Sequence, residues 1–544
     1  MLEIGQIVYI ADHFIMKIFL KNGWSSVFLF YPFMLSFDVG AILFSNNIDV
    51  LFPGQILRPL SILFSITMIL WGGMYLITKD AHRSSYLCFL SILLFFFYDY
   101  LHRFLNDLFL IDSRLKDSQL IVIGVWCLFL GVAASGWLWE QIKDPPKISK
   151  YLSVILLFSL CPVLLKIGWF EYRKMFVPYN SRLQSYTDLL DNLPVHSDSL
   201  PDIYYIILDS YGRGDILMDL YNTDISSFTT FLLNKGFYVA EKSHSNYLQS
   251  EESIASSLNM QYLDILTDMN TSSRQQLLEL IWHSSVRNYL EKNGYLTISL
   301  ASIDDYTDIK DADLYFKGFM DINPIEEMIL SNSIISPLEG VLNLDLPFQS
   351  YRTHYLWNKY TFDKLSEIPE LQSPKFVFVH MVTPHPPFVF DQNGGAITPK
   401  ASFSRLDANG FPGTNEEFIQ GYSQQVQYIN KRFQDIIEEI FEKSLTSPII
   451  ILQGDHGPRR LFNWYSTENN CYREAASILY AIYLPKGDYL NYYSSITPIN
   501  TFRLIFNSYF GSNLPLLEDR IYFSNYLRPY DFVDITNIAD KQCH

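Results

Sequence analysis

The side chains best suited to chemistry follow two short apolar runs. Asp209 comes directly after IYYIIL, and the pair Asp455 and His456 comes directly after PIIILQG. Two carboxylates and an imidazole form a mixed oxygen and nitrogen ligand set, which suits Mn, Zn or Mg better than a metal that prefers thiolates. Taken singly, each has a simpler explanation, since Asp209 also fits a turn and the Asp-His-Gly sequence also fits a polar loop. Together they predict a site for one divalent metal ion.

A serine suited to act beside such an ion lies in the stretch SNYLQSEESIASSL. We expect a helix to begin there, with Ser250 at its N-cap and Glu251 and Glu252 in its first turn. A helix N-terminus binds anions, and metal coordination lowers the pKa of a hydroxyl, so Ser250 is a candidate metal ligand and nucleophile. Ser250 also fits an ordinary cap, and serines further along the helix compete with it. The two glutamates would either repel an anionic substrate or face solvent.

An α/β fold must position these residues. After a polar connector at 171–201, strand and helix patterns alternate through 202–544, which predicts an extracytoplasmic α/β domain with a mainly parallel central sheet. The short apolar runs indicate strands covered on both faces, and ligands bind beyond the carboxyl ends of such strands. A third run, KFVFVHMVTPHPPF, puts His380 at a strand end and His385 in a proline-rich loop. His380 fits either a supporting residue or a member of the site.

Residues 1–170 have a different composition, dense in Leu, Ile, Phe and Trp, and predict an α-helical membrane domain of about five spans. The apolar segments lie at about 26–45, 57–77, 84–101, 119–139 and 151–169. Apolar residues on all faces of a helix argue against a buried helix of a soluble protein. The distribution of Lys and Arg between the segments favours a cytoplasmic N-terminus. With five spans, the protein lies in the inner (plasma) membrane, and its second domain lies on the outer or periplasmic side.

Net charge and cysteine content restrict the partners. The formal net charge is -17 and no basic stripe is present, which excludes a nucleic acid partner because polyanion binding needs clustered Lys and Arg. None of the five cysteines has the spacing of a structural zinc site. Cys471 and Cys543 would pair in an oxidising compartment, and the sequence alone leaves that pairing open.

Four motifs in one order carry a family resemblance. They are IILDSYGR, SNYLQSEESIASSLNMQYL, HMVTPHPPF and ILQGDHGPR. In this order they resemble the sulfatase-like hydrolases and transferases of the alkaline phosphatase superfamily, over roughly residues 200–510. The membrane-bound members of that group include lipoteichoic acid synthases and phosphoethanolamine transferases, whose multi-span N-terminal layout is similar to that of this chain.

The resemblance implies a role for each residue. Asp209 matches the first acidic metal ligand, Asp455 and His456 match the paired ligands, and Ser250 matches the residue that ligates metal and attacks phosphorus. His385 matches a histidine that contacts the transferred group or protonates the leaving oxygen.

The sequence departs from the family pattern in two ways that bear on the reaction. The sequence lacks the Cys/Ser-x-Pro-x-Arg pattern of sulfatases that make a formylglycine, which counts against sulfate esters. It also lacks a later site histidine, which favours one metal ion over two.

The implied reaction is metal-dependent transfer of a phosphoryl-linked group through a covalent serine intermediate. A membrane lipid is the expected donor of a head group, and a glycan or a lipid is the expected acceptor. A phosphodiesterase, or another phosphate or sulfate ester hydrolase with the same residues, is one alternative. A non-catalytic membrane scaffold that keeps the fold is another.

Overall fold

A computed structural model describes most of the chain. The described residues are 29–109, 144–174, 200–303, 305–318, 322–335, 350–399 and 403–543, with a few single positions between 123 and 194. The chain divides into two compact units. One unit comprises Met1–Val177 and Ile322–Phe348, and the other comprises Pro178–Asp321 and Gln349–His544.

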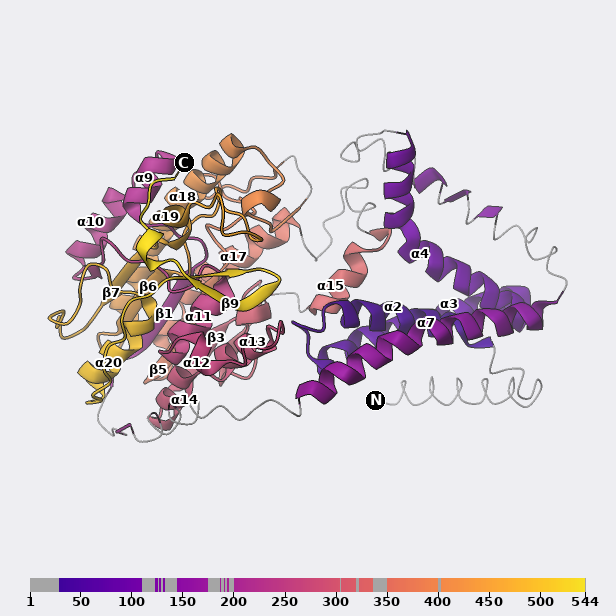
Figure 1. Ribbon diagram of the computed structural model, residues 1–544, viewed down its shortest axis with the longest axis horizontal. Helices are drawn as coiled ribbons and strands as arrows, with labels where there is room; N and C mark the ends of the chain where they lie inside the picture. The colour runs from indigo at the N-terminus through magenta and orange to yellow at the C-terminus, as the bar shows by residue number, and fades with distance from the viewer. Residues whose placement is uncertain are drawn as a thin grey trace. The chain divides into compact units, whose positions relative to one another are not determined.

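A seven-stranded sheet forms the centre of the second unit (Figure 1). Its strands lie in the order β2-β7-β6-β1-β5-β3-β4. Their bounds are β1 Ile203–Leu208, β2 Tyr238–Val239, β3 Leu296–Leu300, β4 Leu314–Phe316, β5 Lys375–Met381, β6 Ile449–Gly454 and β7 Tyr480–Tyr483. Only the pairings of β7 with β2 and β6 are antiparallel in this sheet. The prediction of an α/β domain with a mainly parallel sheet is therefore confirmed.

Helices cover both faces of the sheet, which explains why the central strands are apolar throughout. On β1, the side chains of Tyr204 and Ile206 enter a core shared with the long helix α18. The side chain of Tyr205 points to the other face and packs on Phe378 and Phe502. The helices are α9 Gly214–Tyr221, α10 Ser226–Asn234, α11 Ser250–Asn259, α12 Leu263–Leu266, α13 Gln275–Trp282, α14 Ser285–Lys292, α17 Tyr351–Leu365, α18 Asn415–Lys443, α19 Tyr472–Ala476 and α20 Thr501–Tyr509.

The register of the three central strands brings their carboxyl ends to one level. Leu208 at the end of β1 lies opposite Met381 of β5 and Gly454 of β6. The residues that follow, Asp209 and Asp455, therefore emerge side by side at one edge of the sheet. This is the edge at which parallel α/β sheets bind ligands.

A small hairpin and a disulfide complete the second unit. Strands β8 Tyr522–Asn525 and β9 Arg528–Asp534 pair antiparallel as a separate two-stranded sheet. Cys471, at the N-cap of α19, is joined by a disulfide to Cys543, 72 residues further along the chain. The pairing that the sequence left open is therefore present in the structure.

The first unit is helical. Helices α2, α3 and α7 run side by side (Figure 1), and α4 packs against them. Their bounds are α2 Tyr31–Asn46, α3 Leu57–Thr78, α4 Ala81–Phe109 and α7 Pro145–Lys174. By length and composition, two helical stretches of the described residues are long and apolar enough to cross a membrane, Pro53–Thr78 and Pro145–Lys174. They contain the predicted segments 57–77 and 151–169.

The other three predicted spans are not among the described helices that are long and apolar enough to cross a membrane. Segment 26–45 overlaps α2, which has 16 residues, and segment 84–101 lies in α4, where the apolar part Ala81–Phe96 is shorter than a span. Segment 119–139 falls mostly outside the described residues. The bundle of about five spans stays a prediction.

One short helix packs with the first unit although its sequence position, inside 202–544, placed it in the catalytic domain. Helix α15, Pro324–Ser331, buries Ile325 and Ile329 in a cluster with Phe44 and Leu63. The two isoleucines of α15 bury their apolar surface against residues that are far away in the sequence. The position of α15 along the chain therefore did not reveal this packing. Arg58 of α3 also donates to the carboxylate of Glu326, at 2.7 and 2.5 Å.

Candidate active site

The ends of the central strands position the candidate site residues through their backbone. The Asp209 amide donates to the carbonyl of Met381 at 2.9 Å, and the His385 amide donates to the Asp209 carbonyl at 3.0 Å. Ser210 takes a left-handed conformation with φ 66°, and its amide donates to Asp455 Oδ1 at 3.0 Å. The two acidic residues are therefore tied to each other and to the loop after β5.

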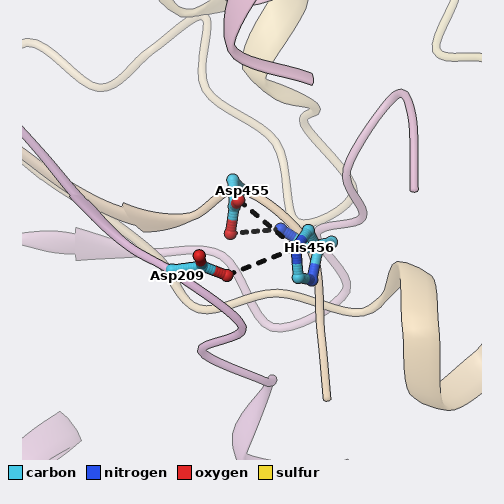
Figure 2. A group of neighbouring side chains, drawn as sticks. All are labelled: Asp209, Asp455 and His456. Carbon is cyan, nitrogen blue, oxygen red and sulfur yellow. Dashed lines mark hydrogen bonds and ion pairs between the residues drawn. The ribbon is translucent and has the colours of Figure 1, made fainter. Parts of the chain in front are cut away.

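Asp209, Asp455 and His456 converge as the sequence predicts (Figure 2). His456 Nε2 lies 3.3 Å from Asp209 Oδ1 and 3.3 Å from Asp455 Oδ2, and all three side chains are buried. Two ligands about 2.1 Å from a tetrahedral ion lie about 3.4 Å from each other. The separations between these three groups therefore match those of ligands that share one small divalent cation.

The hydrogen bonds of His456 support the same fit. Its Nδ1 lies 2.9 Å from the carbonyl of Gly457, which can only accept, so the proton sits on Nδ1 and the Nε2 lone pair faces the two carboxylates. Burial, and next the charge of Arg459, lower the pKa of His456 to about 3, so the ring is neutral. The buried Asp455 Oδ2 accepts no hydrogen bond from the described residues. A lone pair and carboxylate oxygens turned toward each other repel unless a cation lies between them.

Ser250 lies beside this group. Its Oγ is 3.1 Å from His456 Nε2. Helix α11 begins at Ser250 itself and Gln249 takes the N-cap position, so the prediction that Ser250 caps the helix is wrong by one residue. Of the competing serines, Ser253 donates its hydroxyl to the backbone carbonyl of Asp455 at 2.7 Å, and the hydroxyls of Ser256 and Ser257 donate to other backbone carbonyls. Ser250 is therefore the one of these four helix serines whose hydroxyl reaches His456, while Ser210 Oγ lies 3.2 Å from Asp209 Oδ1.

The two glutamates after Ser250 do not face solvent. Glu251 is 9% exposed and Glu252 is fully buried. Glu251 pairs with Arg274, and Glu252 accepts hydrogen bonds from Ser524. Glu252 is therefore directed into the protein, whereas Glu251 lies at the wall of the pocket beside Ser250 with its charge offset by Arg274.

His385 belongs to a buried ionic group that sequence reasoning did not find. Its Nε2 lies 3.4 Å from Asp407 Oδ2, and Arg459 donates from Nε and Nη2 to the same oxygen, each at 2.7 Å. Burial lowers the pKa of His385, but the carboxylates of Asp209 and Asp407 outweigh it and raise this pKa to about 9. Beside Asp407 and at the wall of the site, His385 is suited to contact a phosphate oxygen or donate a proton. Arg459 could have been found from the sequence, because it directly follows the Asp-His-Gly-Pro motif. No sequence motif marks Asp407.

His380 lies next to the group of three without joining it. Its Nε2 is 3.8 Å from Asp209 Oδ2 and 3.8 Å from Asp455 Oδ2, while its Nδ1 is 2.9 Å from Thr307 Oγ1. These distances fit a residue of β5 that supports the two carboxylates.

A pocket of about 510 Å³ opens onto these residues. Charged groups and aromatic rings share its wall, so it can receive an anion with an organic substituent. It is lined by Asp209, Gln249, Ser250, Glu251, Tyr306, Val382, His385, Phe403, Ser404, Arg405, Leu406, Asp407, Arg459, Trp464, Tyr465 and Tyr526.

This fold and this edge of the sheet define an enzyme of the sulfatase-like superfamily. Residues 201–483, just over half of the chain, match the family model described as Sulfatase. The chain therefore belongs to the sulfatase family, and the resemblance drawn from the four motifs is confirmed at that level. No curated protein matches the chain.

The comparison with solved structures finds three bacterial proteins among those similar to this chain. The C-terminal periplasmic domain of EcEptC from Escherichia coli, in complex with Zn, is 12% identical over 63% of this chain and 95% of that chain, with a TM-score of 0.41. The same domain of phosphoethanolamine transferase EptC from Campylobacter jejuni is 12% identical over 60% and 92%, with a TM-score of 0.36. The integral membrane protein lipooligosaccharide phosphoethanolamine transferase A (EptA) from Neisseria meningitidis is 11% identical over 89% and 94%, with a TM-score of 0.35.

Proposed function

We propose that this protein transfers a phosphoryl-linked group, such as a lipid head group, to a glycan or lipid acceptor through a covalent intermediate on Ser250. The observation that carries the proposal is the 3.1 Å separation of Ser250 Oγ from His456 Nε2, where the carboxylates of Asp209 and Asp455 also converge. A hydroxyl in this position would share an ion held by the three buried residues, and it faces a pocket that contains His385 and Arg459.

The chain's own residues divide the work. Asp209, Asp455, His456 and Ser250 would hold one Mn, Zn or Mg ion, which when bound lowers the pKa of the serine hydroxyl and offsets phosphate charge. The ionised Ser250 Oγ attacks phosphorus, a bond forms to Oγ, and the bond from phosphorus to the leaving alcohol breaks. His385, which lies beside Asp407 at the wall of the pocket, gives its proton to the departing oxygen.

The second step reverses the roles. Neutral His385 takes the proton of the acceptor hydroxyl, whose oxygen attacks the phosphorus on Ser250, and Ser250 leaves with the electrons of its bond to phosphorus. Arg459, held by Asp407, is placed to bind a phosphate oxygen in both steps. The sum is exchange of one alcohol for another on phosphorus, with the enzyme unchanged.

The exposed apolar helices of the first unit favour a lipid as the donor. The most apolar windows of Pro53–Thr78 and Pro145–Lys174 are only 11% buried within the protein, so their apolar surfaces are left for lipid. We place the protein in the inner (plasma) membrane as a multi-pass protein, with the catalytic domain on the outer or periplasmic side. The disulfide between Cys471 and Cys543 supports an oxidising compartment for that domain.

An ester hydrolase is the second candidate, because the chain matches the sulfatase family and water can replace the acceptor in the same pocket. The purified full-length protein is incubated with Mn and with phosphatidylethanolamine or phosphatidylglycerol labelled in the head group. A labelled glycan or lipid acceptor supports transfer, and a free labelled head group supports hydrolysis. Ser250→Ala and Asp455→Ala each abolish both products if the site acts as proposed. Intact cellular function of both variants would instead identify a non-catalytic scaffold.

A further inference from the structure

One buried arginine bonds to the residues on both sides of Ser250. Arg274, directly before α13, donates from Nη1 to the carboxylate of Glu251 and from Nη2 to the side-chain oxygen of Gln249, the latter at 2.7 Å. Burial of a guanidinium is costly unless its donors are matched, and here the planar fork meets two acceptors that flank a single residue. One side chain therefore holds both sequence neighbours of Ser250, Gln249 and Glu251, in place.

A serine from the β8–β9 hairpin makes a second link to the same turn. Gln249 Nε2 donates to Ser524 Oγ at 2.6 Å, and Ser524 Oγ donates to Glu252 at 2.7 and 2.8 Å from the two carboxylate oxygens. The hairpin also meets the arginine, because Arg274 Nη2 donates to the carbonyl of Tyr526 at 2.7 Å and its guanidinium lies 4.6 Å from the Tyr526 ring centroid. Arg274 and the β8–β9 hairpin therefore both contact the start of α11, and they contact each other.

This arrangement replaces an ordinary helix cap. Among the described contacts, the side chain of Gln249 makes no capping hydrogen bond to the first turn of α11, although it occupies the N-cap position. An uncapped helix start frays, which would let the first helical residue move. That first residue is Ser250.

We infer that Arg274 and Ser524 are positioning residues that hold Ser250 with its hydroxyl toward Asp209 and Asp455. The inference deepens the proposed function and rests on it. Neither residue touches the reacting atoms; both act through Gln249 and the two glutamates. A nucleophile misplaced by about 1 Å loses on the order of 100-fold in rate, so the contacts are expected to act on the chemical step.

The test compares full-length variants in two measurements. Arg274→Lys keeps the charge and loses the fork, Ser524→Ala loses the second link, and Arg528→Ala removes an exposed arginine of the same hairpin as a matched control. We expect the first two to slow formation of phospho-Ser250 from a labelled lipid by about 10- to 100-fold with little change in KM for the donor. Amide hydrogen exchange across residues 249–252 is expected to rise in both variants, with Arg528→Ala unchanged.

Arg274→Ala extends the test, because millimolar guanidinium ion is expected to restore part of its rate, which a purely structural loss would not allow. If this variant fails to fold, Arg274→Lys and Ser524→Ala decide. Wild-type adduct rate and exchange in both of these would overturn the inference. If the wild-type protein forms no adduct, the proposed function fails, and amide exchange alone then decides whether the contacts hold residues 249–252.

Discussion

At the scale of single residues, Asp407 holds together the cations of the site. It accepts from Arg459, lies 3.4 Å from His385 Nε2, and accepts from the indole of Trp464 at 3.2 Å. The substitution Asp407→Asn keeps the shape but removes the carboxylate that pairs with the buried Arg459 and lies beside His385. Removing one partner of such a buried pair costs about 3–5 kcal/mol, and we expect a lower free energy of unfolding of that order.

The same variant is expected to lose transfer activity, because Arg459 and His385 would no longer be held toward the pocket. Thermal unfolding and labelled-lipid transfer measure the two effects, with the exposed Asp531→Asn as control. Unchanged unfolding and unchanged transfer in Asp407→Asn would show that the ionic group is not needed.

The convergence of Asp209, Asp455 and His456 was predictable at this scale, whereas the residues around them were not. Asp209 and Asp455 follow apolar strands directly, so strand ends place them without knowledge of the rest of the chain. Asp407 reaches the site from a loop whose sequence has no pattern. Arg274 and Ser524 reach Ser250 only through tertiary packing, since 24 and 274 positions separate them from it in the printed numbering.

At the scale of elements, the short helix α19 buries an acid that is costly to ionise. Glu474 accepts from the Tyr221 hydroxyl at 2.6 Å and from the Leu461 amide at 2.8 Å. Burial raises its pKa from 4.5 to about 7. Because the folded state binds this proton more tightly than the unfolded state, stability falls as the pH rises from about 4.5 to about 7 and is constant above that window.

Glu474→Gln imitates the protonated acid, so we expect it to remove this pH dependence. The difference in unfolding free energy between variant and wild type should grow from pH 5 to pH 8 by at most about 3 kcal/mol. Denaturant unfolding of the full-length protein at both pH values measures it, and Glu468→Gln, on the exposed part of the preceding loop, is the control. A difference that is constant with pH would contradict this prediction.

The disulfide at the start of α19 leads to a second prediction for this element. It closes a loop of 72 residues, and loss of a native disulfide costs about 2–5 kcal/mol. Cys543→Ser is expected to destabilise the second unit by that amount and to release Asp540, which pairs with His244 at 2.9 Å. The matched control is Cys161→Ser, which removes an exposed free cysteine. Equal unfolding transitions in the two variants would argue against a stabilising disulfide.

The central strands were predictable because a strand covered on both faces has a recognisable apolar run. The sheet order was not, because it depends on which strands meet across long connections. The cap of α11 was assigned to Ser250 instead of Gln249, since Gln249 takes the cap position through tertiary contacts and not through the usual side-chain preference for an N-cap.

At the scale of the whole molecule, helix α15 lies in sequence between the two parts of the second unit but packs within the first unit. A fragment of residues 178–544 would lose Phe44 and Leu63, and with them the partners of Ile325 and Ile329. We expect the amides of residues 325–331 in α15 to exchange faster in the fragment than in the full-length protein, while those of α18 keep their protection. Equal protection of α15 in both proteins would show that its packing does not depend on the first unit.

The division into an apolar N-terminal part and an α/β part was readable from composition, because long runs of apolar residues fill the first part and charged residues occur throughout the second. The place of α15 was not, because two isoleucines in a short amphipathic helix do not reveal which surface will bury them.

The central claim is that Ser250 carries the transferred group. The most direct measurement is the intact mass of the purified full-length protein, followed by peptide mapping, after exposure to bacterial lipids with Mn. We predict a mass increase equal to the phosphoryl-linked head group, located on Ser250, absent in Ser250→Ala and present in Ser256→Ala, a buried serine further along the same helix. No adduct under turnover with an active donor, or an adduct on any other residue, would contradict the claim.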